Sequence, residues 1–190
     1  VVRRVAEEWK SSEVAIRAHG GKVIDALRSS AAPPASEVSE DILRSAYEEF
    51  ARNYDLEWGG FGTGEQFPRA SVFNFLLRLH ATAPASPEGK AALEMTRNTL
   101  HKMASGGIRD HIGGGFHRYA VDRAWRVPHF EKMLYDQAQL AVTYCEAWQI
   151  TGDPLFQAVA RSTLAYVLRE LTHPEGGFFS AAAAASLVAH

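Results

Sequence analysis

The chain has 190 residues, of which 46% are hydrophobic and 22% charged, and its formal net charge is −2. This length and composition are those of an ordinary globular protein with one sizeable core. The small net charge and the lack of any run near the roughly 18 apolar residues of a membrane span leave no argument for a nucleic-acid or membrane partner.

The first thirty residues have the pattern of a helix rather than of a targeting segment. Residues 1–4 read Val-Val-Arg-Arg and lack the apolar stretch of a signal peptide. A loose apolar stripe predicts one long helix, or a helix broken around Gly20-Gly21, followed by an Ala- and Pro-rich linker at 31–35. The chain has no initiator Met and opens directly in this pattern, so we expect a piece of a longer protein. The expected division is into an N-terminal helix with its linker, residues 1–35, and a main domain, residues 36–190.

The main domain begins with two further predicted helices. Ser39 is a predicted N-cap, followed by two acids that the helix dipole favours in a first turn, and the helical spacing continues to Tyr54. After Pro68, apolar residues at helical spacing predict a short helix as far as His80.

Three later helices are predicted from prolines at their first positions, where the missing N–H costs nothing. They start at Ser86-Pro87, at Pro128 and at Asp153-Pro154, and their apolar stripes end near Met103, Trp148 and Leu171. No segment of useful length alternates like a strand. The predicted fold class is therefore all-α, with consecutive helices packed as hairpins.

A Gly-Gly-Phe pattern occurs three times between the helical stretches, with its phenylalanines at 61, 116 and 178. The recurrence every 55 to 62 residues, with two helices between marks, is typical of an α-hairpin repeat. Two of the connections, roughly 55–69 and 105–127, are long enough to suggest a functional role. We expect the three Gly-Gly-Phe loops to lie together at one end of the hairpins.

Titratable and aromatic residues concentrate between Gly106 and Gln137. A glycine-rich loop that carries histidines and acids into the start of a helix has the groups that acid/base chemistry needs. The candidates in this stretch are Asp110, His111, His117, Arg118, Asp122, Trp125, His129, Glu131 and Asp136.

The same stretch, GGIRDHIGGGFHRYAVDRAWRVPHFEKMLYDQAQL, resembles the thioredoxin-domain-containing DUF255 family, the spermatogenesis-associated protein 20-like proteins. The segments WGGFG…FPRAS at 58–71 and GGFFSA at 176–181 fall where that family has its other glycine-aromatic motifs. The resemblance implies a thioredoxin-like domain, missing here, before an (α/α)6 toroid similar to six-hairpin glycosidases and N-acylglucosamine 2-epimerases. It places residues 36–190 in the first half of that toroid. The rest of the toroid, or another chain, is then expected to cover an apolar face that three hairpins leave open.

The chain departs from the family pattern at two places. Gln66 stands where the family usually has Lys before Phe-Pro. In the third motif the family is acidic, whereas residues 180–186 read Ser-Ala-Ala-Ala-Ala-Ala-Ser. Three acids are thus replaced by Ala182, Ala183 and Ala185, and this loop contributes no carboxylate.

Two functions fit these residues. The first is a carbohydrate-active site, in which His117 and His129 move a proton on and off the carbon next to a carbonyl, as in an epimerase, or Glu131 and Asp110 act as a hydrolytic pair. The second is a non-catalytic ligand- or protein-binding module attached to a thioredoxin-like domain, since fold does not imply function. For the first function, sugar stacking is expected on Trp58, Phe61, Phe116 and Trp125, and hydroxyl binding at Arg118, Asp110, Asp122 and Asp136.

Simpler interpretations stand beside each of these. Glu131 could only stabilise a helix start at Pro128, and Lys132 and Asp136 could be an exposed i,i+4 pair. The histidines match no metal-ligand spacing, and the glycine runs match no dinucleotide fingerprint, so no metal or other cofactor is expected. Cys145, the only cysteine, lies on an apolar stripe and fits an inert core position. A single cysteine is compatible with a reducing compartment, and the expected location is cytoplasmic.

Overall fold

The computed structural model describes residues 2–31 and 40–183. The chain divides into two compact units, with the division between Ile42 and Leu43. This lies close to the predicted boundary at residue 35. The Ser39 cap, most of the 31–35 linker and Ala185 fall outside the described residues. None of the described helices combines the length and the apolar content needed to cross a membrane.

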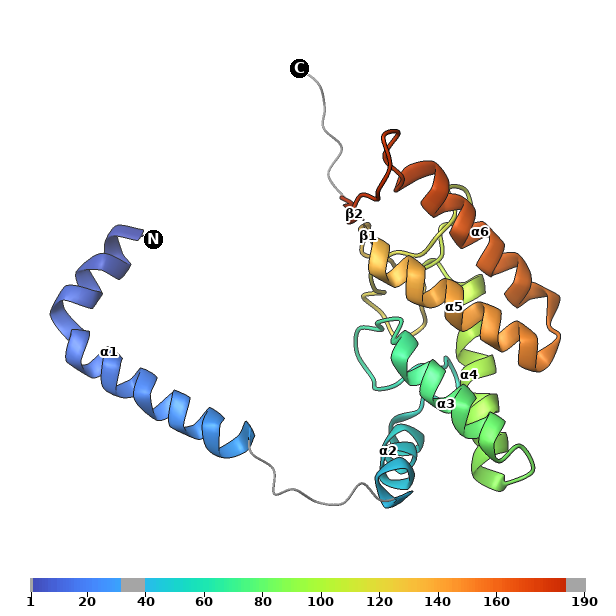
Figure 1. Cartoon of the computed structure of the whole chain (residues 1–190), viewed down its shortest axis with the longest axis horizontal. Coiled ribbons are helices and arrows are strands. Elements are labelled where there is room, and N and C mark those ends of the chain that lie inside the picture. The colour runs from blue at the N-terminus through green and yellow to red at the C-terminus, as the bar shows by residue number, and fades with distance from the viewer. Residues whose placement is uncertain (1, 32–39, 184–190) are drawn as a thin grey trace. The chain divides into compact units, whose positions relative to one another are not determined.

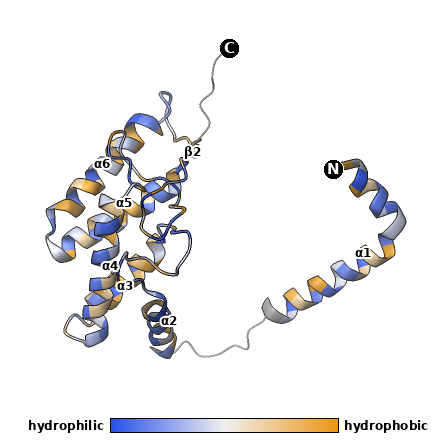
Figure 2. Cartoon of the chain, turned by 180° about the vertical axis from the view of Figure 1, so that it is seen from behind, coloured by the Kyte–Doolittle hydropathy of each residue, from blue (hydrophilic) through white to orange (hydrophobic). Residues whose placement is uncertain are grey.

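The first unit is mainly one long helix, α1 (Val2–Ala31), whose apolar residues are exposed along its length. Figure 2 shows hydrophobic and hydrophilic residues alternating along it. The helix is interrupted at Ser12, where φ is −134°, and not at Gly20-Gly21 as the sequence suggested. Both glycines stay helical, whereas serine hydroxyls compete for backbone groups: Ser11 Oγ donates to the Glu8 carbonyl at 3.2 Å.

Four of the remaining helices begin and end close to their predicted limits. They are α2 (Glu40–Asn53), α3 (Ala70–Thr82), α4 (Pro87–Ser105) and α6 (Pro154–Glu170). The predicted caps are present: Ser86 Oγ accepts from the Gly89 amide, and the Asp153 carboxylate accepts from the Leu155 amide. Local capping chemistry therefore determined these boundaries.

The helix α5 (Leu134–Thr151) starts six residues later than predicted. Pro128 does not start this helix. Residues 128–133 are extended, because several of their backbone groups form hydrogen bonds with other segments of the chain. The His129 amide donates to the Tyr119 carbonyl, and the Leu134 amide to the Ser180 carbonyl. Long-range backbone pairing has here overridden a local helix-start signal.

Two short strands are the departure from an all-helical fold. β1 (Lys132–Met133) pairs antiparallel with β2 (Ala181–Ala182), with Lys132 opposite Ala182 and Met133 opposite Ala181. Strands of two residues carry no alternation that a sequence pattern could reveal. The pairing joins the third Gly-Gly-Phe motif to the start of α5, and the fold remains built of helices.

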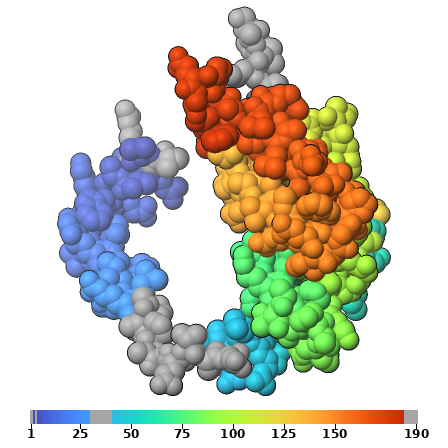
Figure 3. Space-filling model, turned by 45° about the vertical axis from the view of Figure 1, so that its right-hand side comes forward, coloured from blue at the N-terminus to red at the C-terminus, as the bar shows by residue number. Residues whose placement is uncertain are grey.

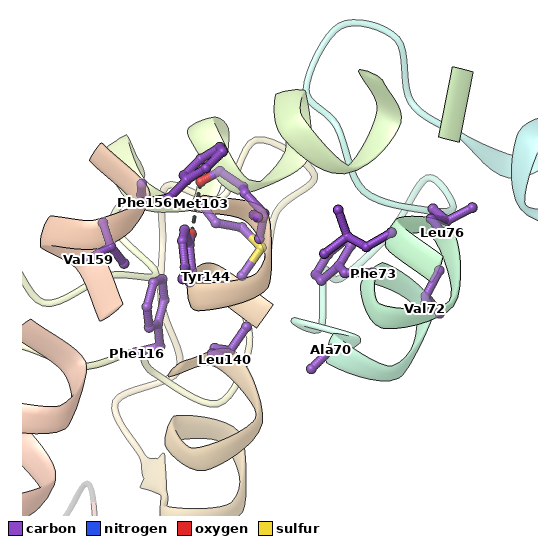
Figure 4. Packing of buried hydrophobic residues seen from close by; sticks show 14 of the residues in the cluster. Ala70, Val72, Phe73, Leu76, Met103, Phe116, Leu140, Tyr144, Phe156 and Val159 are labelled. Carbon is purple, nitrogen blue, oxygen red and sulfur yellow. Dashed lines mark hydrogen bonds between the residues drawn. The ribbon is translucent and has the colours of Figure 1, made fainter. Parts of the chain in front are cut away.

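The helices pack as two antiparallel hairpins, α3 with α4 and α5 with α6, and α3 also packs against α5 (Figure 1). Figure 3 shows α5 and α6 side by side. The core between them contains Tyr144, whose hydroxyl donates to the Leu100 carbonyl at 2.9 Å, and Phe116, which stacks on the Tyr144 ring (Figure 4). Burial of such large side chains stabilises the fold by roughly 1.5–3 kcal/mol each.

The long loops are joined to one another by backbone hydrogen bonds. We call residues 54–69 the first loop and residues 106–133 the second loop. Gln66 of the first and Ala120 of the second exchange two bonds, at 2.8 and 2.9 Å. The third Gly-Gly-Phe segment joins them through the Leu134–Ser180 hydrogen bond and the pairing of β2 with β1. Backbone hydrogen bonds therefore connect all three glycine-rich segments.

Several large apolar side chains of α5 and α6 are exposed. They are Val142, Trp148, Leu164 and Leu168, each at least one-third exposed. Exposed apolar side chains are expected where a toroid is only partly present. What covers them stays a prediction.

Candidate functional site

The second loop folds back on itself as an irregular hairpin. Residues 117–121 run beside 127–131: the Arg118 amide donates to the Glu131 carbonyl at 2.7 Å, and the Val121 amide to the Val127 carbonyl at 2.9 Å. His117, Arg118, His129 and Glu131 therefore lie on two neighbouring extended segments. Sequence alone had placed the last two at a helix start.

Close packing holds the glycine run of this loop in place. Gly114 and Gly115 both have positive φ, a region that glycine enters without steric cost. A Cβ on Gly115 would lie 2.7 Å from the Tyr166 ring and 2.8 Å from Gln137 Oε1. Gln137, fully buried on α5, binds both backbone groups of Phe116, each at 2.8 Å. The loop is thus attached to α5 and α6 by contacts that only a glycine permits.

The carboxylate of Asp110 is bound by other groups of the protein. It accepts hydrogen bonds from the amides of Ile112 and Gly113 and forms an ion pair with Lys132 Nζ at 2.7 Å. Burial alone would raise the pKa of Asp110, but the Lys132 bond and the two amide bonds outweigh it and hold this pKa well below its ordinary value. An acid of this kind stays ionised near neutral pH and is a poor proton donor.

Lys132 is not part of an exposed pair with Asp136, because it is buried and bonds to Asp110 instead. Its ammonium group also donates to the Gly114 carbonyl at 2.8 Å and lies 4.3 Å from the centre of the Tyr166 ring. The i,i+4 interpretation is wrong because residue 132 precedes the helix.

Glu131 forms an ion pair with Arg118: the Glu131 carboxylate lies 2.9 Å from the Arg118 guanidinium. It does not occupy the first turn of a helix, so the dipole interpretation is wrong as well. Neither member of the predicted hydrolytic pair, Glu131 and Asp110, is therefore free of a cationic partner.

Asp122 is also bound to backbone. Its oxygens accept from the amides of Ala124, Arg126 and Val127, the last at 2.6 Å. Burial acts to raise the pKa of Asp122, and these amide bonds overcome it and lower the pKa. These bonds close the turn at 122–127, and sugar binding by Asp122 stays a prediction.

Within the described residues, three buried polar side-chain atoms have no hydrogen-bond partner, and all belong to predicted site residues: His117 Nδ1, His129 Nδ1 and Asp136 Oδ2. Burial lowers the pKa of His117, Lys132 lowers it further, and Asp110 partly opposes them. Burial raises the pKa of Asp136 to about 6, against the opposing charge of Arg118. Unsatisfied buried polar groups are rare and call for an explanation.

The two histidines have different aromatic neighbours. His117 meets the exposed Phe130 edge-on at 5.2 Å between centroids. His129 stacks on Tyr119 at 4.8 Å, and Tyr119 stacks in turn on Phe67 at 4.7 Å. The joint action of the two histidines stays a prediction. The same holds for a site role of His111, whose ring bonds to the Gly106 carbonyl.

The four aromatic rings predicted to stack on a sugar are all in contact with other parts of the protein. Phe61, Phe116 and Trp125 are buried in the core, and a buried ring cannot receive a sugar without leaving it. Trp125 also donates its indole N–H to the Trp58 carbonyl. The Trp58 ring is in contact with the charged groups of Lys102 and Arg126, at 5.1 and 4.8 Å from its centre. Core packing is the role that the structure gives Phe61, Phe116 and Trp125, whereas sugar stacking on the half-buried Trp58 stays a prediction.

Two residues that hold the glycine run, Lys132 and Gln137, were not among the site residues predicted from the sequence. Both satisfy backbone groups of the glycine run, at Gly114 and at Phe116. A run of three glycines with no side chains of its own needs donors and acceptors from elsewhere, and this was the available signal. Within residues 2–31 and 40–183, no group of three or more His, Cys, Asp or Glu side chains is arranged to hold a metal ion.

The chain is homologous to spermatogenesis-associated protein 20 over 95% of its length, at 42% identity to the rat protein (Rattus norvegicus) and 41% to the human protein (Homo sapiens). It spans 24% of each of those relatives. No family model matches the chain.

Solved structures show the same fold, helical hairpins of an (α/α)6 toroid. Cellobiose 2-epimerase from Bacillus thermoamylovorans matches 73% of the chain with a TM-score of 0.59 and 15% identity. Cellobiose 2-epimerase from Spirochaeta thermophila matches 78%, with a TM-score of 0.56 and 19% identity. A D-mannose isomerase matches 76%, with a TM-score of 0.53 and 12% identity. The chain covers 39–41% of these structures.

Proposed function

We propose that this chain carries part of a carbohydrate-active site in which the second loop exchanges a proton with a sugar at the carbon next to its carbonyl. The observation that carries the proposal is the set of unpartnered buried atoms on His117, His129 and Asp136. Proton transfer needs groups that can both take and release a proton near neutral pH. A neutral imidazole with a lowered pKa, such as His117, can take one.

The fold supports this class of chemistry. Proteins named as sugar 2-epimerases and as a D-mannose isomerase share the toroid, and both kinds of reaction begin at a carbon beside a carbonyl. With the family resemblance, the proposed arrangement is a thioredoxin-like domain followed by a toroid, of which residues 36–190 form the first half. The remaining hairpins then cover the exposed apolar side chains of α5 and α6.

Proton exchange fits better than glycoside hydrolysis. Hydrolysis needs one carboxyl that is protonated and one that is ionised. The pKa of Asp110 is held low, and Glu131 is bound to Arg118. In the pair chosen for hydrolysis from the sequence, Asp110 is therefore a poor proton donor and Glu131 is engaged in an ion pair.

The second candidate is a binding module without catalysis. Two ion pairs, Asp110–Lys132 and Arg118–Glu131, favour the binding module, because their charged groups bind one another and hold the loop in place. The two candidates differ in whether a bound sugar loses a proton.

The test uses the full-length protein in deuterated water with a panel of aldoses and N-acyl hexosamines, followed by proton NMR at C2. We expect exchange at C2 for at least one sugar, at more than about ten times the rate without protein. His117→Ala and His129→Ala should each lower it by about 100-fold or more, the scale of a lost acid/base group. His19→Ala, on the exposed surface of α1, is the matched control. Sugar binding without exchange would establish the binding module instead.

A further inference from the structure

Three rings from three extended segments are stacked face to face where the two long loops meet. Phe67 of the first loop lies on Tyr119, with 4.7 Å between the ring centroids and 20° between the ring planes. Tyr119 lies in turn on His129, with 4.8 Å and 14°. We call these three rings the aromatic stack. Neither Phe67 nor Tyr119 was among the site residues predicted from the sequence.

Backbone pairing explains why these rings meet. Gln66 pairs antiparallel with Ala120, and Ala120 pairs antiparallel with Pro128, so three extended segments lie side by side. The His129 amide also donates to the Tyr119 carbonyl at 2.9 Å. Each ring of the aromatic stack belongs to a residue next to one of the paired residues, and side chains opposite one another on neighbouring antiparallel segments share a face and interact. The stack is therefore built by the same pairing that joins the two loops.

The ring of His129 depends on this contact for its orientation. Its buried Nδ1 has no hydrogen-bond partner, whereas a hydrogen bond from one ring nitrogen is the usual way in which a functional histidine is oriented. The torsion that turns an imidazole relative to its Cβ has broad energy wells, so packing must decide it. A nearly parallel ring at 4.8 Å restricts that rotation. His117 differs, because its neighbour Phe130 meets it edge-on and is 65% exposed.

We propose that Tyr119 and Phe67 are positioning residues, which hold the imidazole of His129 at the angle from which it exchanges a proton with the sugar. The inference rests on the proposed function and leaves the proton transfer with His117 and His129. Tyr119 acts by direct contact with His129, and Phe67 acts through Tyr119. The first loop thereby contributes to the site through a ring contact rather than through a polar group.

Proton transfer is sensitive to the angle of the imidazole. An acid/base group must come within roughly 2.6–3.2 Å of the atom that it serves, and a misplacement of about 1 Å can cost about 100-fold in rate. An imidazole that rotates carries both ring nitrogens away from the productive position, whereas the other groups that bind the sugar stay where they are. Loss of the aromatic stack should therefore lower kcat and leave KM nearly unchanged.

The experiment compares Tyr119→Leu, Tyr119→Phe, Phe67→Leu and the control Phe179→Leu in the full-length protein. Phe179 is a matched control for Phe67: the two are 46% and 42% exposed, and the Phe179 ring also contacts a histidine, His173, at 5.4 Å. We expect Tyr119→Leu to lower kcat for C2 exchange by about 10- to 100-fold, with KM within about threefold. Phe67→Leu should lower kcat by about three- to tenfold. Tyr119→Phe keeps the ring and should match the wild type, as should Phe179→Leu.

Carbon relaxation NMR of the His129 ring, in protein labelled at histidine, reports the mobility of this imidazole without any sugar. The order parameter of the ring should be near that of a rigid backbone, about 0.85, in the wild type, in Tyr119→Phe and in Phe179→Leu. In Tyr119→Leu it should fall below about 0.6, the range of a flexible group. Phe67→Leu should give a value between the two.

The outcomes separate this inference from the proposed function. If the wild type exchanges C2 protons but Tyr119→Leu keeps kcat within about threefold, or Tyr119→Phe loses as much as Tyr119→Leu, the aromatic stack does not position His129 and the sugar site stands. If no sugar exchanges, the proposed function fails. In that case a mobile His129 ring in Tyr119→Leu still supports the stack as the device that orients it, and a rigid ring there overturns this too. Should Tyr119→Leu fail to fold, Phe67→Leu, at the exposed end of the stack, decides in the same way.

Discussion

The two long loops are anchored in similar ways but leave their polar groups in different states. In the first loop, Asp55 accepts from the amides of Glu57 and Trp58 and from Arg123, and its side chain is 6% exposed. The buried Gln66 bonds to two carbonyls of its own loop. The second loop is also held by hydrogen bonds to its surroundings, yet His117, His129 and the adjoining Asp136 each have a buried atom without a hydrogen-bond partner.

This difference is the reason that we propose the second loop, rather than the first, as the site of chemistry. Burying a polar atom without a partner costs about 1–3 kcal/mol, and the first loop avoids this cost among the described residues. The second loop bears this cost at two atoms, on His117 and His129, and the adjoining Asp136 of α5 bears it at a third; these atoms could instead exchange protons or meet a ligand. Four paired substitutions break or sharpen this comparison, from the largest expected effect to the smallest.

The largest effect is expected where both loops approach other elements most closely. Gly60→Ala and Gly115→Ala should each lower the free energy of unfolding by about 2–5 kcal/mol, from roughly 1–2 for positive φ and 1–3 for overpacking. The new Cβ meets Gln66 and Trp125 in the first case, and Gln137 and Tyr166 in the second. Gly176→Ala has a positive φ but open space, so it should cost only the roughly 1–2 kcal/mol of strain. Chemical denaturation measures all three. Unequal losses for the first two would mean that the loops are not anchored alike.

The second pair tests the side chains that hold each loop. Gln137→Ala leaves both backbone groups of Phe116 unsatisfied and should cost about 3 kcal/mol. Thr99→Ala removes one acceptor, for the Gly60 amide, and should cost about 1–2 kcal/mol. The control Gln139→Ala, at an exposed position of α5, should stay within about 0.5 kcal/mol. Native-state hydrogen exchange at the loop amides resolves these values, and equal losses for Gln137 and Thr99 would contradict the ranking.

The third pair predicts opposite signs for the same chemical change. Burial acts to raise the pKa of Asp55, but its amide and Arg123 bonds lower it overall, so its stabilisation is present above about pH 4 and is lost as the pH falls. Asp55→Asn should therefore destabilise at pH 7 by about 1–2 kcal/mol, and less at pH 3.

Asp136 has a raised pKa of about 6, so the stability it contributes is present below about pH 4 and is lost as the pH rises through 6. Asp136→Asn should be more stable than the wild type by about 1–2 kcal/mol at pH 7.5, discounted for partial exposure, and nearly equal at pH 4. Thermal melts at the two pH values check both variants. A destabilised Asp136→Asn at pH 7.5 would show that the carboxylate has a partner and is structural.

The smallest effects concern the two arginines. Arg123→Ala removes the cation from Asp55 and should cost about 1 kcal/mol at low salt. Arg118→Ala should change stability less, because its partner Glu131 has a 27% exposed side chain whereas that of Asp55 is 6% exposed, but it should raise the pKa of Asp136 and weaken sugar exchange. Melting curves give the first value and C2 exchange rates the second. A stability loss for Arg118→Ala larger than for Arg123→Ala would reverse the contrast between the loops.

Sequence reasoning located the site better than it described it. The glycine spacing and the density of titratable groups directed attention to the second loop, which holds two of the unpartnered atoms. The role of each residue did not follow, because Asp110, Asp122 and Glu131 look alike in sequence. Only their partners, at 2.6–2.9 Å, separate them from Asp136. Three of the four predicted aromatic platforms, Phe61, Phe116 and Trp125, were wrong for the same reason, since burial depends on what packs against a ring.

What the sequence determined by itself is what short-range physics controls: the caps at Ser86 and Asp153, the helical periodicity, the glycine loops and hence the hairpin fold. The tertiary structure decided what depends on distant partners. It kept residues 128–133 extended through bonds to Tyr119 and Ser180, and directed Lys132 to Asp110 across 22 positions of chain. It also left Asp136 without a partner, because no donor reaches its buried oxygen. A pattern in sequence reports a residue's own neighbours, whereas the free energy of a buried charge is set by whatever the fold brings to it.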